Sequence, residues 1–279
     1  MNPESVPGYV ALRGDGAPTG RGSSAFTAVK PLDFEIDSTS AIGIVGESGS
    51  GKSTLARMLV GLEPVSSGVV TYNAAPLPQF LRSRTGRRDF RAAVQFVAQD
   101  TSSSFDPRRT LGDAVETPLA ILHGITGDAA AERVAEVLAL LQLDPGHLRR
   151  YPSEVSGGQR QRFALARALV VRPRILLCDE VVSALDVSVQ GTVLNIIKEY
   201  CETNAVGLAF VSHGLPATAF VARELVVMRA GEVVERGPTR QVLDDPQHPY
   251  TASLLAAYRR DRAVVGPAER PVVAAVGPA

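Results

Sequence analysis

Residues 41–53 read AIGIVGESGSGKS, and this stretch decides the fold. Its first five residues are apolar and run into a glycine-rich segment, as in a buried strand of a largely parallel sheet. Residues 46–53 fit the pattern G-x-x-x-x-G-K-[ST], and residues 53–62 carry apolar side chains at helical spacing. A strand, a glycine-rich loop and a helix in this order predict a loop that cradles phosphate groups.

The residue types in this loop suit the phosphates of a nucleoside triphosphate. Glycine lets the backbone curl, so that N–H groups and the helix N-terminus can point at phosphate oxygens. Lys52 would reach the β- and γ-phosphates, and the hydroxyl of Ser53 would ligate Mg²⁺. Because kinases and GTPases share the pattern, it indicates a nucleotide and no particular reaction. The residues expected to bind the nucleotide here are Gly46, Ser48, Gly49, Ser50, Gly51, Lys52, Ser53 and Thr54.

An apolar strand that ends in two carboxylates follows later in the chain. Residues 174–180 read RILLCDE, so Asp179 and Glu180 come directly after the apolar stretch. A strand end beside a phosphate loop is where a Mg²⁺-organising aspartate belongs, which assigns that role to Asp179. Glu180 would face the attacking water as a general base or orienting group. The alternative is a strand capped by two solvated acids.

Strand and helix patterns alternate along the rest of the chain. Between about residues 111 and 170 only helical spacing appears, which predicts a helical insert. The alternation outside this insert predicts an α/β fold with a largely parallel sheet. The other runs predicted as strands are 69–72, 93–97, 175–177, 208–211, 225–228 and 232–235, the last two joined by a hairpin turn at Ala230-Gly231.

Composition limits the class of protein. The 279 residues are 45% hydrophobic and 21% charged, an ordinary globular balance. Lys+Arg and Asp+Glu number 29 each, and this zero net charge argues against a nucleic-acid partner. Cys178 and Cys201 are too few for a disulfide framework and fit a reducing compartment. No apolar run long enough for a membrane span and no secretory leader pattern is present, so we expect any link to a membrane to pass through another protein.

A second glycine motif changes the interpretation. Residues 155–159 read VSGGQ and precede a helical pattern, which alone could be a plain helix N-cap. The chain, however, carries in order the phosphate loop, Gln99, VSGGQ, Asp179-Glu180, the segment SALD at residues 183–186, and His213. With these motifs the chain resembles the nucleotide-binding subunits of ABC transporters over about residues 25–260. VSGGQ is similar to the family signature, SALD to its D-loop, and His213 to its switch histidine.

The resemblance implies a P-loop NTPase core with a mixed, largely parallel sheet, an inserted α-helical subdomain and an N-terminal antiparallel β part. The RecA-like core would comprise residues 25–100 and 170–243, and the helical subdomain residues 101–169. Residues 244–260 would form a C-terminal family segment. Outside this ATPase domain, we expect residues 1–24 to be irregular and residues 261–279 to form a flexible tail, because both are rich in Gly and Pro.

The resemblance also implies a head-to-tail dimer with ATP and Mg²⁺ as cofactors. Each ATP would lie between the phosphate loop of one subunit and the signature of the other, and Asp186 would act across the interface. Gln99 would sense the γ-phosphate and Mg²⁺, and His213 would hold the γ-phosphate and the water. The implied catalytic residues are Glu180, His213, Gln99 and Lys52. The implied signature contacts are Ser156, Gly157, Gly158 and Gln159. The implied Mg²⁺ ligands are Ser53, Gln99 and Asp179.

Three segments look like the peptide and nickel importer branch of the family: FDPRRTLG at residues 105–112, VVSALDVSVQ at 181–190 and DPQHPYT at 245–251. This likeness implies an ATPase that powers import of oligopeptides or dipeptides, with nickel or another metal chelate as the alternative cargo. The implied partners are two transmembrane permease subunits, a second ATPase subunit (a copy or a paralogue) and an extracytoplasmic solute-binding protein. The chain would act at the cytoplasmic face of the cell membrane. A soluble, non-transport ABC ATPase is the remote alternative.

The chain departs from the family pattern at a few positions. Gly214 stands where an aspartate usually follows the switch histidine, which could loosen that loop. The aromatic residue that would stack on adenine is open between Phe26 and Tyr9. The arginines of residues 82–91 are expected to form a solvated face, with contact to lipid headgroups as the alternative.

Overall fold

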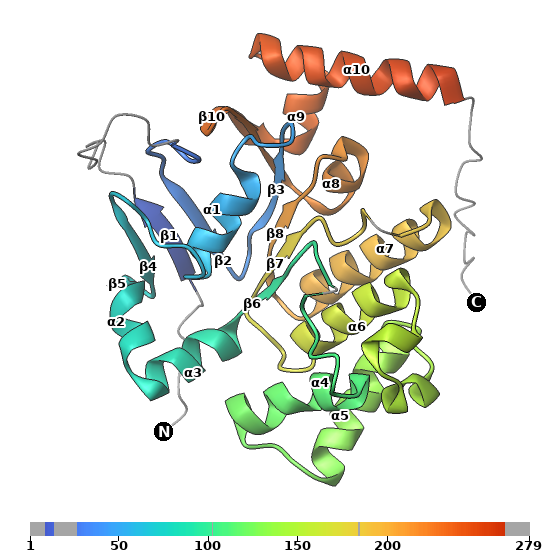
Figure 1. The fold of residues 1–279 in the computed structure, drawn as a ribbon. Coiled ribbons are helices and arrows are strands. Elements are labelled where there is room, and N and C mark those ends of the chain that lie inside the picture. The colour runs from blue at the N-terminus through green and yellow to red at the C-terminus, as the bar shows by residue number, and fades with distance from the viewer. Residues whose placement is uncertain (1–8, 14–26, 102, 184, 266–279) are drawn as a thin grey trace, which may run out of the picture.

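The computed structural model describes residues 9–13, 27–101, 103–183 and 185–265. Two sheets and a group of helices make up these residues (Figure 1). Within the described residues the larger sheet has six strands in the order β10-β9-β3-β8-β7-β6. Its strands are β3 (Ala41–Val45), β6 (Val94–Val97), β7 (Ile175–Asp179), β8 (Gly207–Val211), β9 (Glu224–Arg229) and β10 (Glu232–Pro238). All neighbours pair in parallel except β9 and β10, which form the predicted hairpin.

The central strands of the larger sheet are apolar because other elements cover both faces of the sheet. Alternate residues of β7 serve two cores: Ile175 and Leu177 pack toward the smaller sheet, whereas Leu176 and Cys178 pack toward the helices. Helix α1 (Lys52–Leu59) fills the space between the two sheets with Leu55 and its apolar neighbours. The phosphate loop joins the end of β3 to the start of α1. It therefore lies at the carboxyl edge of the larger sheet.

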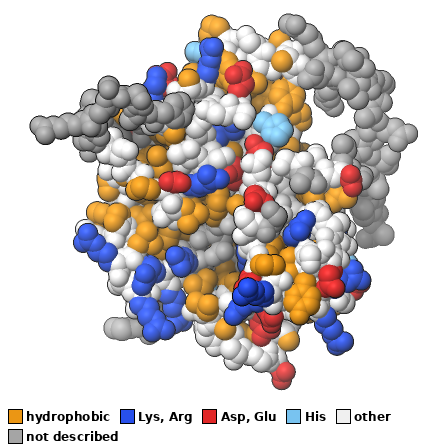
Figure 2. All heavy atoms as spheres, viewed as in Figure 1, with side chains coloured by type: hydrophobic (Ala, Val, Ile, Leu, Met, Phe, Trp, Pro, Cys, Tyr) orange, Lys and Arg blue, Asp and Glu red, His pale blue; other side chains and the backbone are white. Residues whose placement is uncertain are grey.

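The smaller sheet is antiparallel, in the order β2-β1-β4-β5. Its strands are β1 (Tyr9–Arg13), β2 (Phe34–Asp37), β4 (Val69–Tyr72) and β5 (Ala75–Pro76). Two helices that the sequence did not predict, α2 (Leu77–Arg82) and α3 (Arg84–Ala93), follow this sheet and lead into β6. The arginines of residues 82–91 are exposed along these helices, and Figure 2 shows basic side chains gathered in that region.

The prediction that residues 1–24 are irregular is wrong for β1. Val10 and Leu12 are buried in the core, and β1 pairs with both β2 and β4. The alternation is only five residues long and lies among glycine and proline, so local composition hid a strand that tertiary pairing stabilises. The other residues of this segment lie outside the described part of the chain.

The predicted helical insert is present as helices packed on the far side of the larger sheet (Figure 1). It comprises α4 (Leu111–Pro118), the π-helix η1 (Leu119–His123), α5 (Asp128–Leu140), the short 3₁₀ turns η2 (Pro145–Arg149) and η3 (Pro152–Glu154), and α6 (Gly157–Leu169). Helix α7 (Val187–Thr203) packs beside α6 in the same core. The fold class predicted from the sequence is therefore confirmed.

Three further helices, α8 (Leu215–Val221), α9 (Thr239–Asp244) and α10 (Pro249–Val265), share a third core with residues of β3 and β9. Helix α10 runs past residue 261, where the sequence predicted the start of a flexible tail, and residues 266–279 lie outside the described part. Among the described residues, no helix is both long and apolar enough to span a membrane.

Candidate active site

The phosphate loop depends on glycine for its curl. Gly46 has φ 154°, and a Cβ there would lie 2.1 Å from the carbonyl oxygen of Met228. Gly51 has φ 101°, and a Cβ there would lie 2.3 Å from the carbonyl oxygen of Ala28. No other residue type fits both positions, because the backbone of β9 and of residue 28 approaches the loop too closely.

Lys52 points back into this loop. It is 5% exposed, and its Nζ donates to Gly46 O at 2.9 Å, to Glu47 O at 2.8 Å and to Ser50 Oγ at 3.3 Å. Burial lowers the pKa of Lys52, while the carboxylates of Glu180, Asp179 and Glu47 oppose that shift. The ammonium group is thus already positioned where phosphate oxygens would replace some of its backbone acceptors.

Ser53 and Asp179, two of the predicted Mg²⁺ ligands, lie next to each other beside the phosphate loop. Ser53 Oγ donates to Asp179 Oδ1 at 2.9 Å. The other oxygen, Asp179 Oδ2, is buried and has no hydrogen-bond partner among the described residues. Burial raises the pKa of Asp179, and the hydrogen bond from Ser53 opposes this shift. Because Mg²⁺ takes oxygen ligands and often keeps several waters, this hydroxyl and this orphaned carboxylate oxygen fit the ion.

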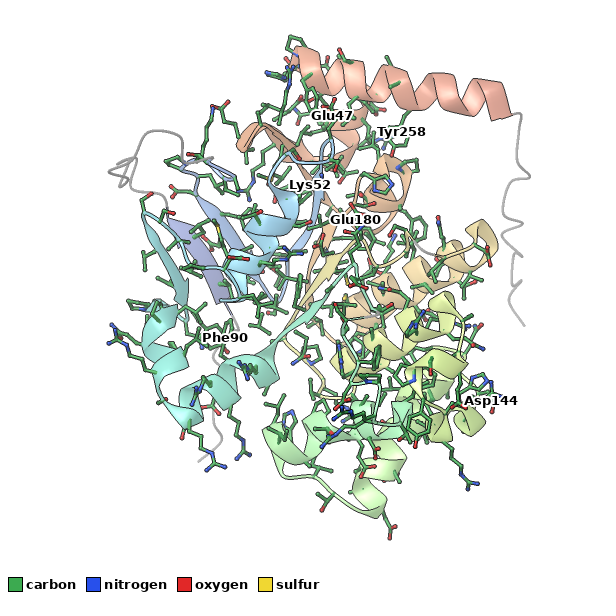
Figure 3. All side chains as sticks on the ribbon, viewed as in Figure 1. Glu47, Lys52, Phe90, Asp144, Glu180 and Tyr258 are labelled. Carbon is green, nitrogen blue, oxygen red and sulfur yellow. The ribbon has the colours of Figure 1, made fainter. Side chains whose placement is uncertain are left out.

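Two other predicted catalytic residues, Gln99 and His213, contact Glu180. Gln99 Nε2 donates to Glu180 Oε2 at 2.6 Å, and His213 Nδ1 lies 3.3 Å from Glu180 Oε1. The three residues follow β6, β7 and β8, whose carboxyl ends meet at one edge of the sheet, and Lys52 lies at the same edge (Figure 3). Gln99 contacts Glu180 here and not Asp179, so its predicted place as a Mg²⁺ ligand is untested.

The backbone at Glu180 is unusual. Its φ is +51°, a left-handed conformation that a glutamate adopts at a cost of about 1–2 kcal/mol. A backbone hydrogen bond from Glu180 N to Val211 O at 2.9 Å fixes this turn against β8. With the backbone in this conformation, the carboxylate contacts Gln99 and His213.

Ser156 and Gln159 of the signature cap a helix, and their capping hydrogen bonds stay within that helix start. Ser156 Oγ accepts from Gln159 N at 3.2 Å, and Gln159 Oε1 accepts from Ser156 N at 2.9 Å, which together form a capping box at α6. A Cβ at Gly157 would have nothing within 4 Å, whereas one at Gly158 would lie 3.1 Å from Leu185 Cδ2. Ser156 and Gly157 are exposed, so this helix start faces outward.

Asp186 begins α7, is exposed and makes no capping hydrogen bond with its side chain. It lies, like the signature, outside the cluster around Glu180. Ala184 of the same segment is outside the described residues, as are Phe26 and the side chain of Tyr9. The prediction of an adenine-stacking aromatic therefore stays open between the latter two.

The sequence missed two tyrosines of α10 that contact the site. Tyr250 Oη accepts a hydrogen bond from Glu47 N at 3.0 Å, and Tyr258 Oη donates to the carbonyl oxygen of His213. Tyr250 belongs to the HPYT segment at residues 248–251, which the sequence analysis used only as a mark of the family branch, and Tyr258 follows that segment. No local pattern signals such contacts, because they join residues more than 40 positions apart.

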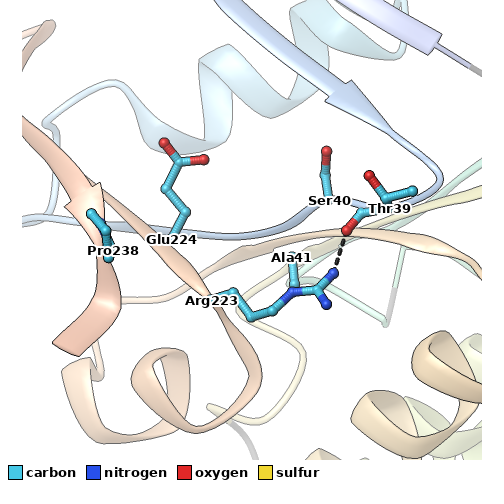
Figure 4. A pocket seen from close by; sticks show the side chains of 6 residues that line it. All are labelled: Thr39, Ser40, Ala41, Arg223, Glu224 and Pro238. Atoms are coloured by element: carbon cyan, nitrogen blue, oxygen red, sulfur yellow. Dashed lines mark hydrogen bonds between the residues drawn. The ribbon is translucent and has the colours of Figure 1, made fainter.

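A surface pocket lies away from this site. A pocket of about 530 Å³ is lined by residues at the starts of β3 and β9, among them Ala41, Arg223 and Glu224 (Figure 4). The phosphate loop follows the other end of β3, so this pocket lies at the opposite edge of the sheet. Its walls carry one arginine and one glutamate, and they include none of the predicted site residues.

These features define a class of protein. A phosphate loop between a buried strand and a helix, with a serine–aspartate pair and a glutamate at the ends of neighbouring parallel strands, is the site of a P-loop nucleotide-binding protein. The chain also carries the VSGGQ segment at the start of α6, where Ser156 and Gly157 are exposed, and this segment is the one that resembles the ABC signature.

Comparisons with known proteins agree with this class. The ABC transporter family matches residues 29–183. The glutathione import ATP-binding protein GsiA of Salmonella paratyphi A is 41% identical over 231 residues, which are 82% of this chain and 37% of that protein. GsiA of Escherichia coli K12 is 40% identical over 230 residues, with the same shares. This chain thus spans little more than a third of the length of these relatives.

Solved structures agree as well. The dimeric structure of MJ0796, described as a bacterial ABC transporter cassette, has a TM-score of 0.75 at 26% identity and covers 83% of this chain and 99% of that one. A second structure of MJ0796, a post-hydrolysis dimer bound to ADP and Pi, has a TM-score of 0.72 at 26% identity with the same coverage.

The chain belongs to the ABC transporter family. The resemblance stated from the motifs is confirmed, and membership of this family of ATPases supports the predicted ATP binding and hydrolysis. The roles of individual residues, and the segment boundaries, stay predictions.

Proposed function

We propose that the chain is the ATP-hydrolysing subunit of a membrane importer whose cargo is a peptide. The observation that carries ATP hydrolysis is the carboxylate of Glu180, which lies beside Gln99 and His213 and next in sequence to the buried Asp179. Peptide cargo rests on the relatives named above, which are glutathione import proteins, because glutathione is a tripeptide. The HPYT segment of residues 248–251 supports the same branch of the family.

The chemistry follows from the positions of the side chains. The β- and γ-phosphates of ATP would lie in the curl of the phosphate loop, where Lys52 would exchange backbone acceptors for phosphate oxygens. Ser53 and Asp179 would hold Mg²⁺, which neutralises phosphate charge when it is bound. Glu180 would orient the attacking water and accept its proton. Gln99 and His213 would keep that carboxylate in place and contact the γ-phosphate.

The signature supplies the other half of a site in a second subunit. The exposed start of α6 presents free N–H groups and the positive end of its helix dipole, both of which favour a phosphate oxygen. Within the described residues the side chains of Ser156 and Gln159 hydrogen-bond to the start of their own helix and not to the phosphate loop, so in a head-to-tail dimer this helix start would face the ATP held by the partner's loop. Asp186, exposed at the start of α7, would lie at the same interface.

The remaining partners follow from the importer assignment. The helical insert would dock onto cytoplasmic helices of two permease subunits, which places the chain peripherally at the cytoplasmic face of the membrane. The second ATPase subunit is a copy or a paralogue. A solute-binding protein on the other side of the membrane would deliver the cargo.

The hydrolysis proposal is tested with Glu180→Gln. The substitution keeps the size of the side chain and removes its charge, so we expect ATP to be bound but turnover to fall about 10²- to 10⁴-fold. ATP should then trap a dimer, read by light scattering. Glu63→Gln, at an exposed position outside the site, is the control and should keep the parental rate. Parental turnover in the Glu180 variant would refute the role assigned to this carboxylate.

The transport proposal is tested by purifying the chain with the products of neighbouring genes. Recovery of permeases and of ATPase activity that rises with a peptide-loaded binding protein supports the assignment. Stimulation by a nickel chelate and not by a peptide would move the cargo to the alternative. Recovery of nucleic acid in place of permeases would contradict the transport role.

A further inference from the structure

Helix α10 touches both loops that frame the candidate active site. Near its start, Tyr250 accepts a hydrogen bond from the backbone N–H of Glu47 in the phosphate loop, at 3.0 Å. Two turns later, the hydroxyl of Tyr258 donates to the carbonyl oxygen of His213. Figure 3 shows Tyr258 at the same end of the molecule as Glu47, Lys52 and Glu180.

The helix is held in place by packing that does not depend on these two hydrogen bonds. Tyr250 and Leu255 are each 6% exposed, and they share a core with Val45, the last residue of β3, and Leu215, the first residue of α8. Tyr258 packs against the same core. The apolar face of α10 thus covers the residue before the phosphate loop and the residue two positions after His213.

Further contacts fix where α10 begins. Glu235 of β10 accepts from Gln247 N at 2.8 Å and from His248 N at 3.1 Å. The guanidinium of Arg229 lies over the ring of Tyr250 at 4.9 Å from its centroid. These interactions anchor the N-terminal end of the helix, so that Tyr258 reaches the His213 loop from a rigid base.

The backbone on either side of His213 is held by hydrogen bonds from Ser212 N to Ile44 O and from Thr218 N to Gly214 O, both at 3.1 Å. The side chain of His213 is 61% exposed and meets Glu180 Oε1 at 3.3 Å. The next residue, Gly214, has no side chain, and its backbone N–H donates to Ser212 Oγ at 2.9 Å. A Cβ at Gly214 would have Tyr258 Oη 3.8 Å away, so the tyrosine hydroxyl occupies the space beside this glycine.

We propose that Tyr258 is a positioning residue for ATP hydrolysis: its hydrogen bond to the His213 carbonyl holds the imidazole against Glu180. The proposal rests on the function proposed above, in which His213 and Glu180 act on ATP. Tyr250 anchors the same helix to the phosphate loop, so α10 ties the two halves of the chain's own site together. Displacement of α10 would let His213 swing away from the carboxylate and slow hydrolysis without removing the nucleotide.

The test is Tyr258→Phe, which keeps the ring in its core and removes the hydroxyl. Because one hydrogen bond to the His213 loop is lost, we expect kcat for ATP to fall about three- to tenfold, while KM changes by less than about twofold. Backbone amides of residues 212–215 should exchange hydrogen faster. The control is Tyr200→Phe, which removes another tyrosine hydrogen bond, from Tyr200 Oη to Leu169 O at 3.4 Å, where the C-terminal parts of α6 and α7 meet, away from the site. It should leave kcat and the exchange of residues 212–215 at parental values.

A double variant tells whether Tyr258 acts through His213. In a His213→Ala background, Tyr258→Phe should cause no further loss of kcat. An equal additional loss in that background would overturn the proposal, as would parental kcat and parental amide exchange in the single variant. If His213→Ala alone keeps the parental rate, the proposed role of His213 in hydrolysis fails. The exchange measurement, which needs no turnover, then still decides whether Tyr258 holds the loop.

Discussion

The helix N-termini of α1 and α6, both of which lie in segments of glycine and serine, differ in how much of their surroundings the chain itself supplies. At the phosphate loop, Lys52 is 5% exposed and bonds to acceptors within its own loop. At the start of α6, Ser156 and Gly157 are exposed, and a Cβ at Gly157 would have nothing within 4 Å. Both can bind an anion by the same physics, yet only the first is enclosed by this chain.

The difference indicates what each segment is for. An enclosed loop needs particular backbone angles, so its sequence is restricted by the fold of this one chain. An open helix start tolerates larger side chains as far as this chain is concerned, so a restriction to glycine there must come from something that docks on it. The following substitutions test this contrast.

The largest effect on stability is expected from Gly46→Ala. The new Cβ would overlap the Met228 carbonyl at 2.1 Å, and the backbone would be held at φ 154°. We expect the free energy of unfolding to fall by about 3 kcal/mol, measured by urea denaturation. The matched variant Gly157→Ala should lose none, because the space around it is open. Equal losses in both variants would remove the contrast between the two regions.

An intermediate effect on stability is expected from Asp179→Asn, which tests the enclosed region around the phosphate loop. Burial raises the pKa of Asp179 in the folded protein, so the folded state favours the protonated acid and is penalised when the acid ionises. The stabilisation from the protonated form is complete below the unfolded pKa and is lost as pH rises through the folded pKa. At pH 7 without ligand, the Asn variant should therefore have the higher Tm.

The pH dependence provides the check on this prediction. The gain in Tm should shrink as pH falls toward and below 3.8, the ordinary pKa of aspartate, where the acid is protonated in both states. Stabilisation of the parent by Mg²⁺ and ATP should be reduced in the variant. An Asn variant that is less stable than the parent at pH 7 would contradict the unfavourable burial of this carboxylate.

The smallest effect on stability is expected from Ser156→Ala. Loss of the cap on α6 should cost about 1 kcal/mol of unfolding free energy, and ATP turnover should also fall. Thr110→Ala removes an equivalent capping box from α4, outside the site, and provides the matched control. It should show a similar loss of stability with parental turnover. If both variants lose turnover alike, the loss reflects helix stability and not contact with a nucleotide.

The two regions also show what the sequence could and could not predict. The phosphate loop and the Asp179–Glu180 pair were found because each is a local pattern with a chemical reason for its residues, and the structure brings them within a hydrogen bond of one another. The apolar runs predicted β3, β7 and β8, because a buried parallel strand can be recognised from its own residues without knowledge of its neighbours.

Two of the misses, strand β1 and the tyrosine contacts of α10, have a common physical cause. Strand β1 is five residues long, and its stability comes from pairing with β2 and β4. The contacts of Tyr250 and Tyr258 with the site depend on how α10 packs, which no local spacing encodes. These features, which distant contacts fix, were therefore missed, whereas the phosphate loop and the Asp179–Glu180 pair, which local chemistry fixes, were found.

The most direct test of the central claim, that each ATP is held between the phosphate loop of one subunit and the signature of another, is ATP turnover by Gly157→Glu. The chain alone offers open space at this position, so the variant should fold with the parental Tm and bind ATP with the parental Kd in monomers. Its carboxylate would repel the partner's γ-phosphate, so turnover should fall at least about 10²-fold and ATP should no longer drive dimerisation. Parental turnover in a stably folded Gly157→Glu variant would contradict the account.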